Sequence, residues 1–184
     1  MCPALFVVVR QAAQNLCVKG NRTIPSGVCL WRGRQLWKRS GNQMNLFDVI
    51  GPVMVGPSSS HTAGAVRIGN VSRKLLGEEV KKAEIGLHGS FLATGNGHGT
   101  DRALIAGLLG LDVDDDRIPH SFELARERGL EFHFDAVDLG EDANPNSARL
   151  LLTSASGREL EIVGASVGGG RIMITELDGL SANF

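Results

Sequence analysis

Helical periodicity and strand alternation occupy different halves of residues 44–184, and this order constrains the fold most strongly. Side chains suited to the interior-facing side of a helix recur every three or four residues from His61 to Leu75, and Gly77 follows. This pattern predicts an amphipathic helix over 61–76 that ends at the glycine. Shorter helices are expected over 100–109 and 121–128, and strands over 83–88, 130–136, 147–153, 159–166 and 171–177. We therefore expect an α+β fold, with a mainly antiparallel sheet and helices packed on one side.

The composition changes abruptly at Met44. Residues 1–43 contain seven basic residues and no acidic one, together with all three cysteines and both tryptophans. Residues 44–184 contain 12 basic and 20 acidic residues, a net charge of −8. We interpret 1–43 as a basic, disordered extension, with a targeting presequence as the alternative. Residues 44–184 are the size of one ordinary domain.

These counts argue against several function classes. The negative charge of 44–184 disfavours nucleic acid as a partner, and no apolar run approaches the ~18 residues of a membrane span. Without cysteine, this part cannot hold a thiolate zinc site or an iron–sulfur cluster of its own, and we expect a reducing, cytoplasmic location. Its only lysines, Lys74, Lys81 and Lys82, are poorly placed for a pyridoxal phosphate Schiff base.

The segment 56–62, Gly-Pro-Ser-Ser-Ser-His-Thr, carries more hydroxyl and imidazole groups than a helix start requires. Ser58, Ser59 and Ser60 offer a choice of N-caps for the predicted helix. Free N–H groups and the helix dipole at such a start favour a carboxylate or a phosphate. The dipole would also lower the pKa of His61 and keep its ring neutral and able to accept a proton. The alternative is an N-cap with a partly buried histidine and no ligand.

Two further segments have the glycine content that lets a backbone approach a ligand closely. The first, 94–101, alternates three glycines and leads into a helix that Thr100 is expected to cap, with Asp101 in its first turn. Its spacing fits neither a dinucleotide fingerprint nor a Walker loop. The second, 166–170, contains three consecutive glycines, too many for a tight hairpin, and we expect a close-approach loop. A flexible turn and an irregular hairpin are the respective alternatives.

Together these segments resemble the β subunit of bacterial iron–sulfur-dependent L-serine dehydratases. The resemblance covers about residues 45–184 and opens with Asn-Leu-Phe-Asp-Val-Ile-Gly-Pro at 45–52. Its other motifs are Gly-Pro-Ser-Ser-Ser-His-Thr at 56–62, Gly-Asn-Gly-His-Gly-Thr-Asp at 95–101, Asn-Pro-Asn-Ser at 144–147 and Ser-Val-Gly-Gly-Gly at 166–170. Several long motifs in the same order make the resemblance specific.

The resemblance implies conversion of L-serine to pyruvate and ammonia with a [4Fe–4S] cluster. In this family the α subunit supplies the cluster cysteines, so an α subunit and L-serine are the implied partners, and the β chain holds no metal ligand. The cluster iron polarises the β-hydroxyl while a base removes the α-proton. His61 is the first candidate for that base or its partner. The residues implied in substrate binding are Ser58, Ser59, Ser60, Thr62, Asn96, His98, Thr100, Asp101, Asn146, Gly168, Gly169 and Gly170.

The family fold also resembles the allosteric substrate-binding domain of some phosphoglycerate dehydrogenases. A non-catalytic domain that binds serine or a small anion is therefore the alternative function. Two features depart from the family pattern: many members have lysine where Asn96 stands, and many two-chain β subunits continue into an ACT domain beyond the position of Phe184. Either the regulation differs or the chain is a fragment.

Overall fold

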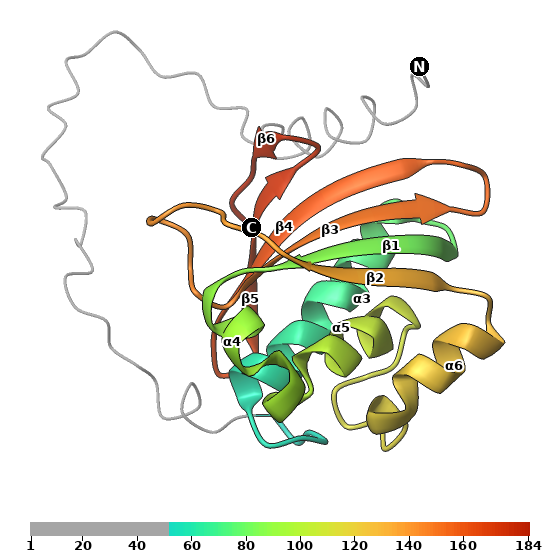
Figure 1. Cartoon of the computed structure of the whole chain (residues 1–184), viewed down its shortest axis with the longest axis horizontal. Helices are drawn as coiled ribbons and strands as arrows, with labels where there is room; N and C mark the ends of the chain where they lie inside the picture. The colour runs from blue at the N-terminus through green and yellow to red at the C-terminus, as the bar shows by residue number, and fades with distance from the viewer. Residues whose placement is uncertain (1–51) are drawn as a thin grey trace, which may run out of the picture. The chain divides into compact units, whose positions relative to one another are not determined.

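The computed structural model describes residues 52–184, apart from the side chain of Asn96. The predicted extension over 1–43 lies outside the described residues. Within them, helices and strands alternate at first and strands follow one another later, and Figure 1 shows the helices gathered on one side of the sheet. The predicted α+β class is confirmed.

In the described part of the chain, six strands form a mixed sheet in the order β2-β1-β3-β4-β5-β6. Their bounds are β1 Val80–Leu87, β2 Glu131–Ala136, β3 Ser147–Ser154, β4 Glu159–Gly168, β5 Arg171–Leu177 and β6 Leu180–Ser181. β1 and β2 pair in parallel, and the other four neighbouring pairs are antiparallel. The parallel pair follows from the chain order, because a long helical crossover separates β1 from β2.

The helices carry the apolar side chains that cover the sheet. Their bounds are η1 Ser59–Ala63, a π-helical turn, α3 Gly64–Leu76, α4 Gly89–His98, α5 Thr100–Leu108, the 3₁₀ turn η2 Ile118–His120, and α6 Ser121–Glu127. α3 ends as predicted, with Gly77 in the left-handed conformation at φ 76°. Among residues 52–184, no helix combines the length and the apolar character needed to cross a membrane. The cytoplasmic location stays a prediction.

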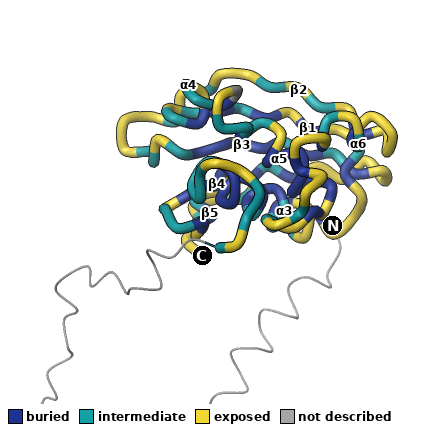
Figure 2. Tube along the Cα trace, turned by 90° about the horizontal axis from the view of Figure 1, so that it is seen from below, coloured by how far each residue is buried: buried dark blue, intermediate teal, exposed yellow. Residues whose placement is uncertain are grey.

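The core lies between α3, α5 and the inner face of the central strands. Ile68 and Leu104 on the helices, and Ile85, Leu150 and Ile162 on the strands, are almost completely buried. Figure 2 shows dark blue, buried stretches along α3, α5 and β3, whereas β2 at the edge of the sheet is mostly half-buried or exposed. The helix faces and strand alternation seen in the sequence therefore converge on one core.

Two sequence predictions about local structure are wrong. No helix is expected between residues 88 and 100, but Gly89–His98 forms helix α4, which the fully buried Phe91 anchors in the core. Burial of this ring outweighs the poor helix propensity of the glycines. Thr100 does not cap α5: the N-cap is Gly99, at φ 66°, and Thr100 is already the first helical residue.

The prediction that the triple glycine is too long for a tight hairpin is wrong. The close approach expected there is present at Gly170, where an added Cβ would lie 3.4 Å or less from Arg67, Pro52 and Ala63. Gly168 belongs to β4, beside a register shift in its pairing with β5, and pairs with Arg171. Only Gly169 and Gly170 remain for the turn, with φ values of 61° and 74°. Two consecutive positive φ angles are the requirement of a tight type I′ hairpin, so the segment is a tight hairpin after all.

Candidate active site around His61

One end of the sheet brings the predicted segments together. β1 ends at Leu87, β3 begins at Ser147 and β4 ends at Gly168, and the antiparallel pairing places these three points side by side. The segment that starts α4 therefore meets the Asn144–Ser147 motif and the end of β4. η1 packs over the same region, against α4, α5 and β4.

His61 lies in the middle of the π-helical turn η1. Ser58 is the N-cap, one of the three serines that the sequence offered, and its hydroxyl accepts the backbone N–H of His61 at 3.2 Å. π-helical turns are rare and are frequently found at functional sites. The turn also lies very close to β4, because a Cβ added at Gly64 would overlap the hydroxyl of Ser166. Because position 64 is glycine, the turn can pack directly against strand β4.

Hydroxyl groups contact both ring nitrogens of His61. Nδ1 lies 3.0 Å from the hydroxyl of Ser60 and 3.3 Å from that of Ser58, and those two hydroxyls are 3.3 Å apart. Nε2 lies 3.0 Å from the hydroxyl of Ser90. Three serine side chains thus fix the orientation of one half-buried imidazole.

The surroundings of His61 favour its neutral form. Burial is the largest cause that lowers its pKa, and electrostatic interaction with His98 lowers it further, while a hydrogen bond to the backbone of Ser90 partly opposes both. The two imidazole centroids are 5.1 Å apart, and the Phe91 ring lies 5.4 Å from His61. The direction agrees with the sequence prediction, although the causes are burial and His98. A neutral imidazole can accept a proton at pH 7.

Ser90 is the residue of this cluster that the sequence interpretation missed. It precedes Phe91 in the first turn of α4, 29 residues from His61. Its backbone N–H donates to the carbonyl of Pro145 at 2.7 Å. Gly89 lies at φ 54°, and a Cβ there would come within 2.7 Å of the same carbonyl. The only sequence signal was the glycine beside it, which marks a close backbone approach.

Four buried side-chain atoms of the described residues have no hydrogen-bond partner, and all belong to the predicted segments. They are Nδ1 of His98, Oγ1 of Thr100, Oδ1 of Asn146 and Oγ of Ser166. Buried polar atoms of folded proteins nearly always have a partner. Their concentration in the motifs leaves these four atoms available to ordered water or to a bound ligand.

The remaining predicted residues surround this cluster less directly. Thr62 is buried, and its hydroxyl donates to the backbone carbonyl of His98 at 3.3 Å. The Ser59 carbonyl accepts the N–H of Gly64 and continues the turn. The Asp101 carboxylate accepts the backbone N–H of Arg102 at 2.8 Å, within its own helix.

The glycine hairpin approaches the start of α3 from the other side. The carbonyl of Gly170 accepts a hydrogen bond from Arg67 at 2.6 Å, and a Cβ at Gly170 would lie 3.4 Å from that of Ala63. Gly170 therefore packs against the end of the turn that holds His61, and none of these contacts joins the three glycines to its ring.

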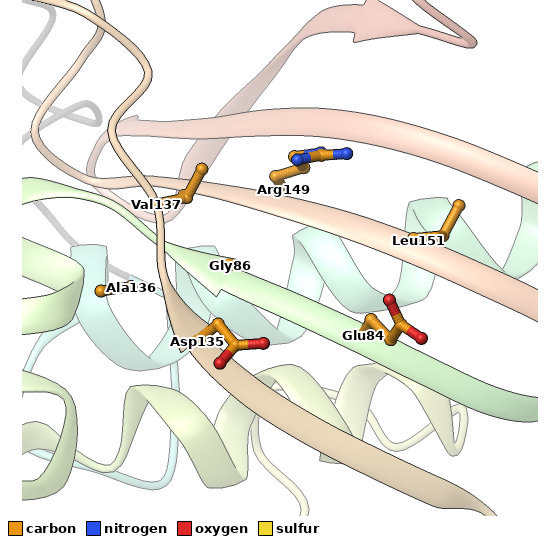
Figure 3. Close-up of a pocket in the computed structure, with 7 residues that line it drawn as sticks. All are labelled: Glu84, Gly86, Asp135, Ala136, Val137, Arg149 and Leu151. Carbon is orange, nitrogen blue, oxygen red and sulfur yellow. The ribbon is translucent and has the colours of Figure 1, made fainter.

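The hollow shown in Figure 3 is separate from this site. It has a volume of about 140 Å³ and lies over strands β1, β2 and β3, on the face of the sheet turned away from the helices. Its lining residues are Glu84, Gly86, Asp135, Ala136, Val137, Arg149 and Leu151. Arg149 is engaged by Glu161 at 2.6 Å. None of the predicted site residues lines this hollow.

Comparison with known proteins agrees with the motifs. The family model described as serine dehydratase beta chain matches residues 44–176. The chain belongs to this family. It is 47% identical over 138 residues to the L-serine dehydratase beta chain of Peptoniphilus asaccharolyticus, a match that covers 75% of this chain and 62% of that one. It is 48% identical over 135 residues to the probable L-serine dehydratase beta chain of Bacillus subtilis, covering 73% and 60%.

A more distant relative is L-serine dehydratase 2 of Escherichia coli, 30% identical over 160 residues, or 72% of this chain and 34% of that protein. The chain spans 60–62% of the length of the beta chains from Peptoniphilus asaccharolyticus and Bacillus subtilis.

Proposed function

We propose that this chain is the β subunit of an L-serine ammonia-lyase, which converts L-serine to pyruvate and ammonia together with an α subunit. The observation that carries the proposal is the His61 cluster: a neutral imidazole, held by three serine hydroxyls, within motifs of a serine dehydratase family. The names of the relatives support the same substrate.

In this proposal His61 takes the α-proton of L-serine, which suits a histidine whose pKa is lowered by burial. Hydroxyls and backbone N–H groups at the start of η1 and α5 hold the substrate carboxylate. Nδ1 of His98, Oγ1 of Thr100 and Oδ1 of Asn146 are free to bind the remaining polar groups. The other proposed contacts are Ser58, Ser59, Ser60, Thr62, Asn96, Asp101, Gly168, Gly169 and Gly170.

The [4Fe–4S] cluster that the family implies does not fit the donors of the described residues. Residues 52–184 contain no cysteine and no group of three or more His, Asp or Glu side chains able to hold a metal ion. Iron–sulfur clusters are held mainly by cysteine thiolates. We therefore assign the cluster to the α subunit, and we derive no step through it for this chain.

The test is an anaerobic pyruvate assay of the full chain combined with an α subunit of the same family. His61→Ala should lower kcat by about 10²–10⁴-fold, the usual cost of losing a general base. His120→Ala, at an exposed histidine beside α6, is the matched control and should keep full activity. Unchanged turnover by His61→Ala would remove His61 from the reaction.

A non-catalytic serine- or anion-binding domain, similar to the allosteric substrate-binding domain of phosphoglycerate dehydrogenases, is the second candidate. The four unpartnered polar atoms support it equally well, because binding a ligand would satisfy them without any reaction. Equilibrium binding separates the two functions. Two quantities are measured for His61→Ala: the affinity for L-serine, and the effect of L-serine on a partner enzyme. If either is weakened while maximal turnover stays normal, the regulatory function is correct.

A further inference from the structure

Strand β2 forms an open edge of the sheet. Among the described residues only β1 pairs with it, and Figure 2 shows β2 at the margin of the tube, mostly half-buried or exposed. Lysine, proline and bulges commonly protect such an edge from pairing. β2 contains neither lysine nor proline, and its register with β1 runs without a shift. The opposite edge, by contrast, is formed by β6, which has only two residues.

The hydrogen bonds of β2 show which of its backbone groups face this open edge. The N–H of Val137 donates to the Leu87 carbonyl of β1 at 3.0 Å. Successive residues of a strand turn their N–H and C=O groups to opposite sides, so the odd-numbered residues of β2 face β1. The backbone groups of Phe132, Phe134 and Ala136 therefore point away from β1, where no described strand lies.

Three phenylalanine rings lie along the same edge, on the face of the sheet that carries the helices. Phe132 and Phe134 of β2 pack against Phe122 of α6, and the three ring centroids are 4.9 to 6.2 Å apart. All three residues are only half-buried, unlike the side chains of the core. The cluster therefore keeps apolar surface that a further strand beside β2 would cover.

The strand β2 of a second copy fits this edge in an antiparallel pair related by a twofold axis. Opposite side chains of such a pair lie on one face of the sheet, so the axis passes beside one residue. If that residue is Phe134, it faces its counterpart and Phe132 faces Ala136, so the outward groups of all three residues form hydrogen bonds. His133 then lies opposite Asp135, which brings an imidazole next to a carboxylate.

The neighbouring registers are less favourable. An axis beside His133 would place Glu131 opposite Asp135, and an axis beside Asp135 would place that carboxylate opposite its own counterpart. Like charges in directly opposite positions are destabilising. An axis beside Phe132 would need the N–H of Leu130, which already donates to the Ala125 carbonyl at 2.9 Å.

We propose that β2 is a dimerisation edge, where a second copy of this chain adds its own β2 in the antiparallel register centred on Phe134. The two six-stranded sheets then become one continuous sheet. The side chains of His133 and Asp135 are 72% and 66% exposed, so both are accessible to the second copy. The proposal concerns the chain itself and does not rest on the proposed reaction.

Sedimentation equilibrium of the full chain measures the dissociation constant of the dimer. The wild type should show a monomer–dimer equilibrium. Ala136→Pro removes an N–H that points away from β1, so this variant should keep the melting temperature of the wild type. Its dissociation constant should rise about tenfold or more, because the dimer uses this N–H twice.

Exchanging two side chains tests the register. His133→Asp places two carboxylates opposite each other at both ends of the pair and should raise the dissociation constant about tenfold. The double variant His133→Asp/Asp135→His carries the same two side chains in exchanged positions and should restore the wild-type value. It is the matched control, because it differs from the single variant only at the residue opposite. A double variant that dimerises as weakly as His133→Asp would show that the register is wrong.

Hydrogen exchange gives an independent measurement of the same edge. The amides of Phe132, Phe134 and Ala136 should be protected only at concentrations at which the chain is dimeric. A wild type that stays monomeric at every concentration would overturn the proposal, and so would a dimer that either Ala136→Pro or His133→Asp leaves unchanged. Protection that appears only when the α subunit is added would assign the edge to that subunit and not to a second copy.

Discussion

At the scale of single residues, the chemistry of His61 depends on neighbours that only the fold supplies. The Ser58–Ser60 motif could be identified from the sequence because it is contiguous with His61 and because serine caps helix starts. Ser90 could not, since its position depends on the Pro145 carbonyl, far away in the sequence. Gly89 beside Ser90 is the only local signal, and a single glycine marks a close backbone approach without naming the partner.

The lowered pKa of His61 predicts a pH dependence of stability. Below about pH 6.5, its ordinary value, the unfolded chain binds a proton that the folded chain resists. The free energy of unfolding should therefore fall as the pH drops from that value toward the lowered folded-state pKa. Above pH 6.5 both states are neutral, and His61 adds no further dependence.

Urea unfolding at several pH values checks this prediction. His61→Gln removes the titrating group, so its stability should fall less steeply than that of the wild type on acidification. His120→Gln, at an exposed histidine, provides the comparison and should follow the wild type. Parallel curves for the wild type and His61→Gln would show that the folded state does not resist protonation of His61.

At the scale of elements, the alternation and spacing of apolar residues were sufficient to locate α3, α5, α6 and the five long strands. They failed for α4, whose sequence is rich in glycine and whose helical state depends on burying Phe91. The β4–β5 hairpin failed for a related reason: a register shift takes Gly168 into the strand, and no pattern in the sequence marks such a shift.

The crossing of α3 and α5 provides a prediction about elements. Gly69 and Gly107 face each other there, and a Cβ at Gly107 would overlap the backbone carbonyl of Val66 and come within 2.9 Å of the Asn70 nitrogen. Backbone atoms cannot turn aside as a flexible side chain can, so the two helices must separate. Gly107→Ala should therefore destabilise the fold by about 3 kcal/mol, at the upper end of the usual cost of overpacking.

Gly97→Ala is the matched control for this substitution. Gly97 lies in helix α4, and a Cβ there would meet nothing within 4 Å. Because alanine is a better helix former, this variant should be neutral or more stable by up to about 1 kcal/mol. Chemical unfolding of both variants measures the difference. A Gly107→Ala variant as stable as Gly97→Ala would show that the helix crossing is looser than described.

At the scale of the whole molecule, the core and the candidate site lie within residues 52–184, and the basic segment before them has no periodic apolar pattern. We predict that a chain starting at Met44 keeps the melting temperature of the full chain. It should also keep its activity with the α subunit. Thermal unfolding of both chains tests this, and a large drop in melting temperature on truncation would show that residues 1–43 contribute to the fold.

The last prediction concerns the division of chemistry between two chains. The described residues offer His61 and hydroxyl groups but no thiolates, and the cysteines of the chain, Cys2, Cys17 and Cys29, all precede Met44. A base without an electron sink does not eliminate water from serine, so the isolated chain should form no pyruvate. It should also retain no stoichiometric iron after anaerobic reconstitution with iron and sulfide.

Metal analysis and the visible absorption spectrum measure the iron, and a variant with all three cysteines replaced by serine is the control. The variant and the wild type should be equally inactive alone and equally active with the α subunit. That activity should decay in air, because oxygen attacks an exposed cluster iron. Stoichiometric iron on the wild type that the serine variant loses would place the cluster ligands on this chain, and pyruvate formed by the isolated chain would refute the division.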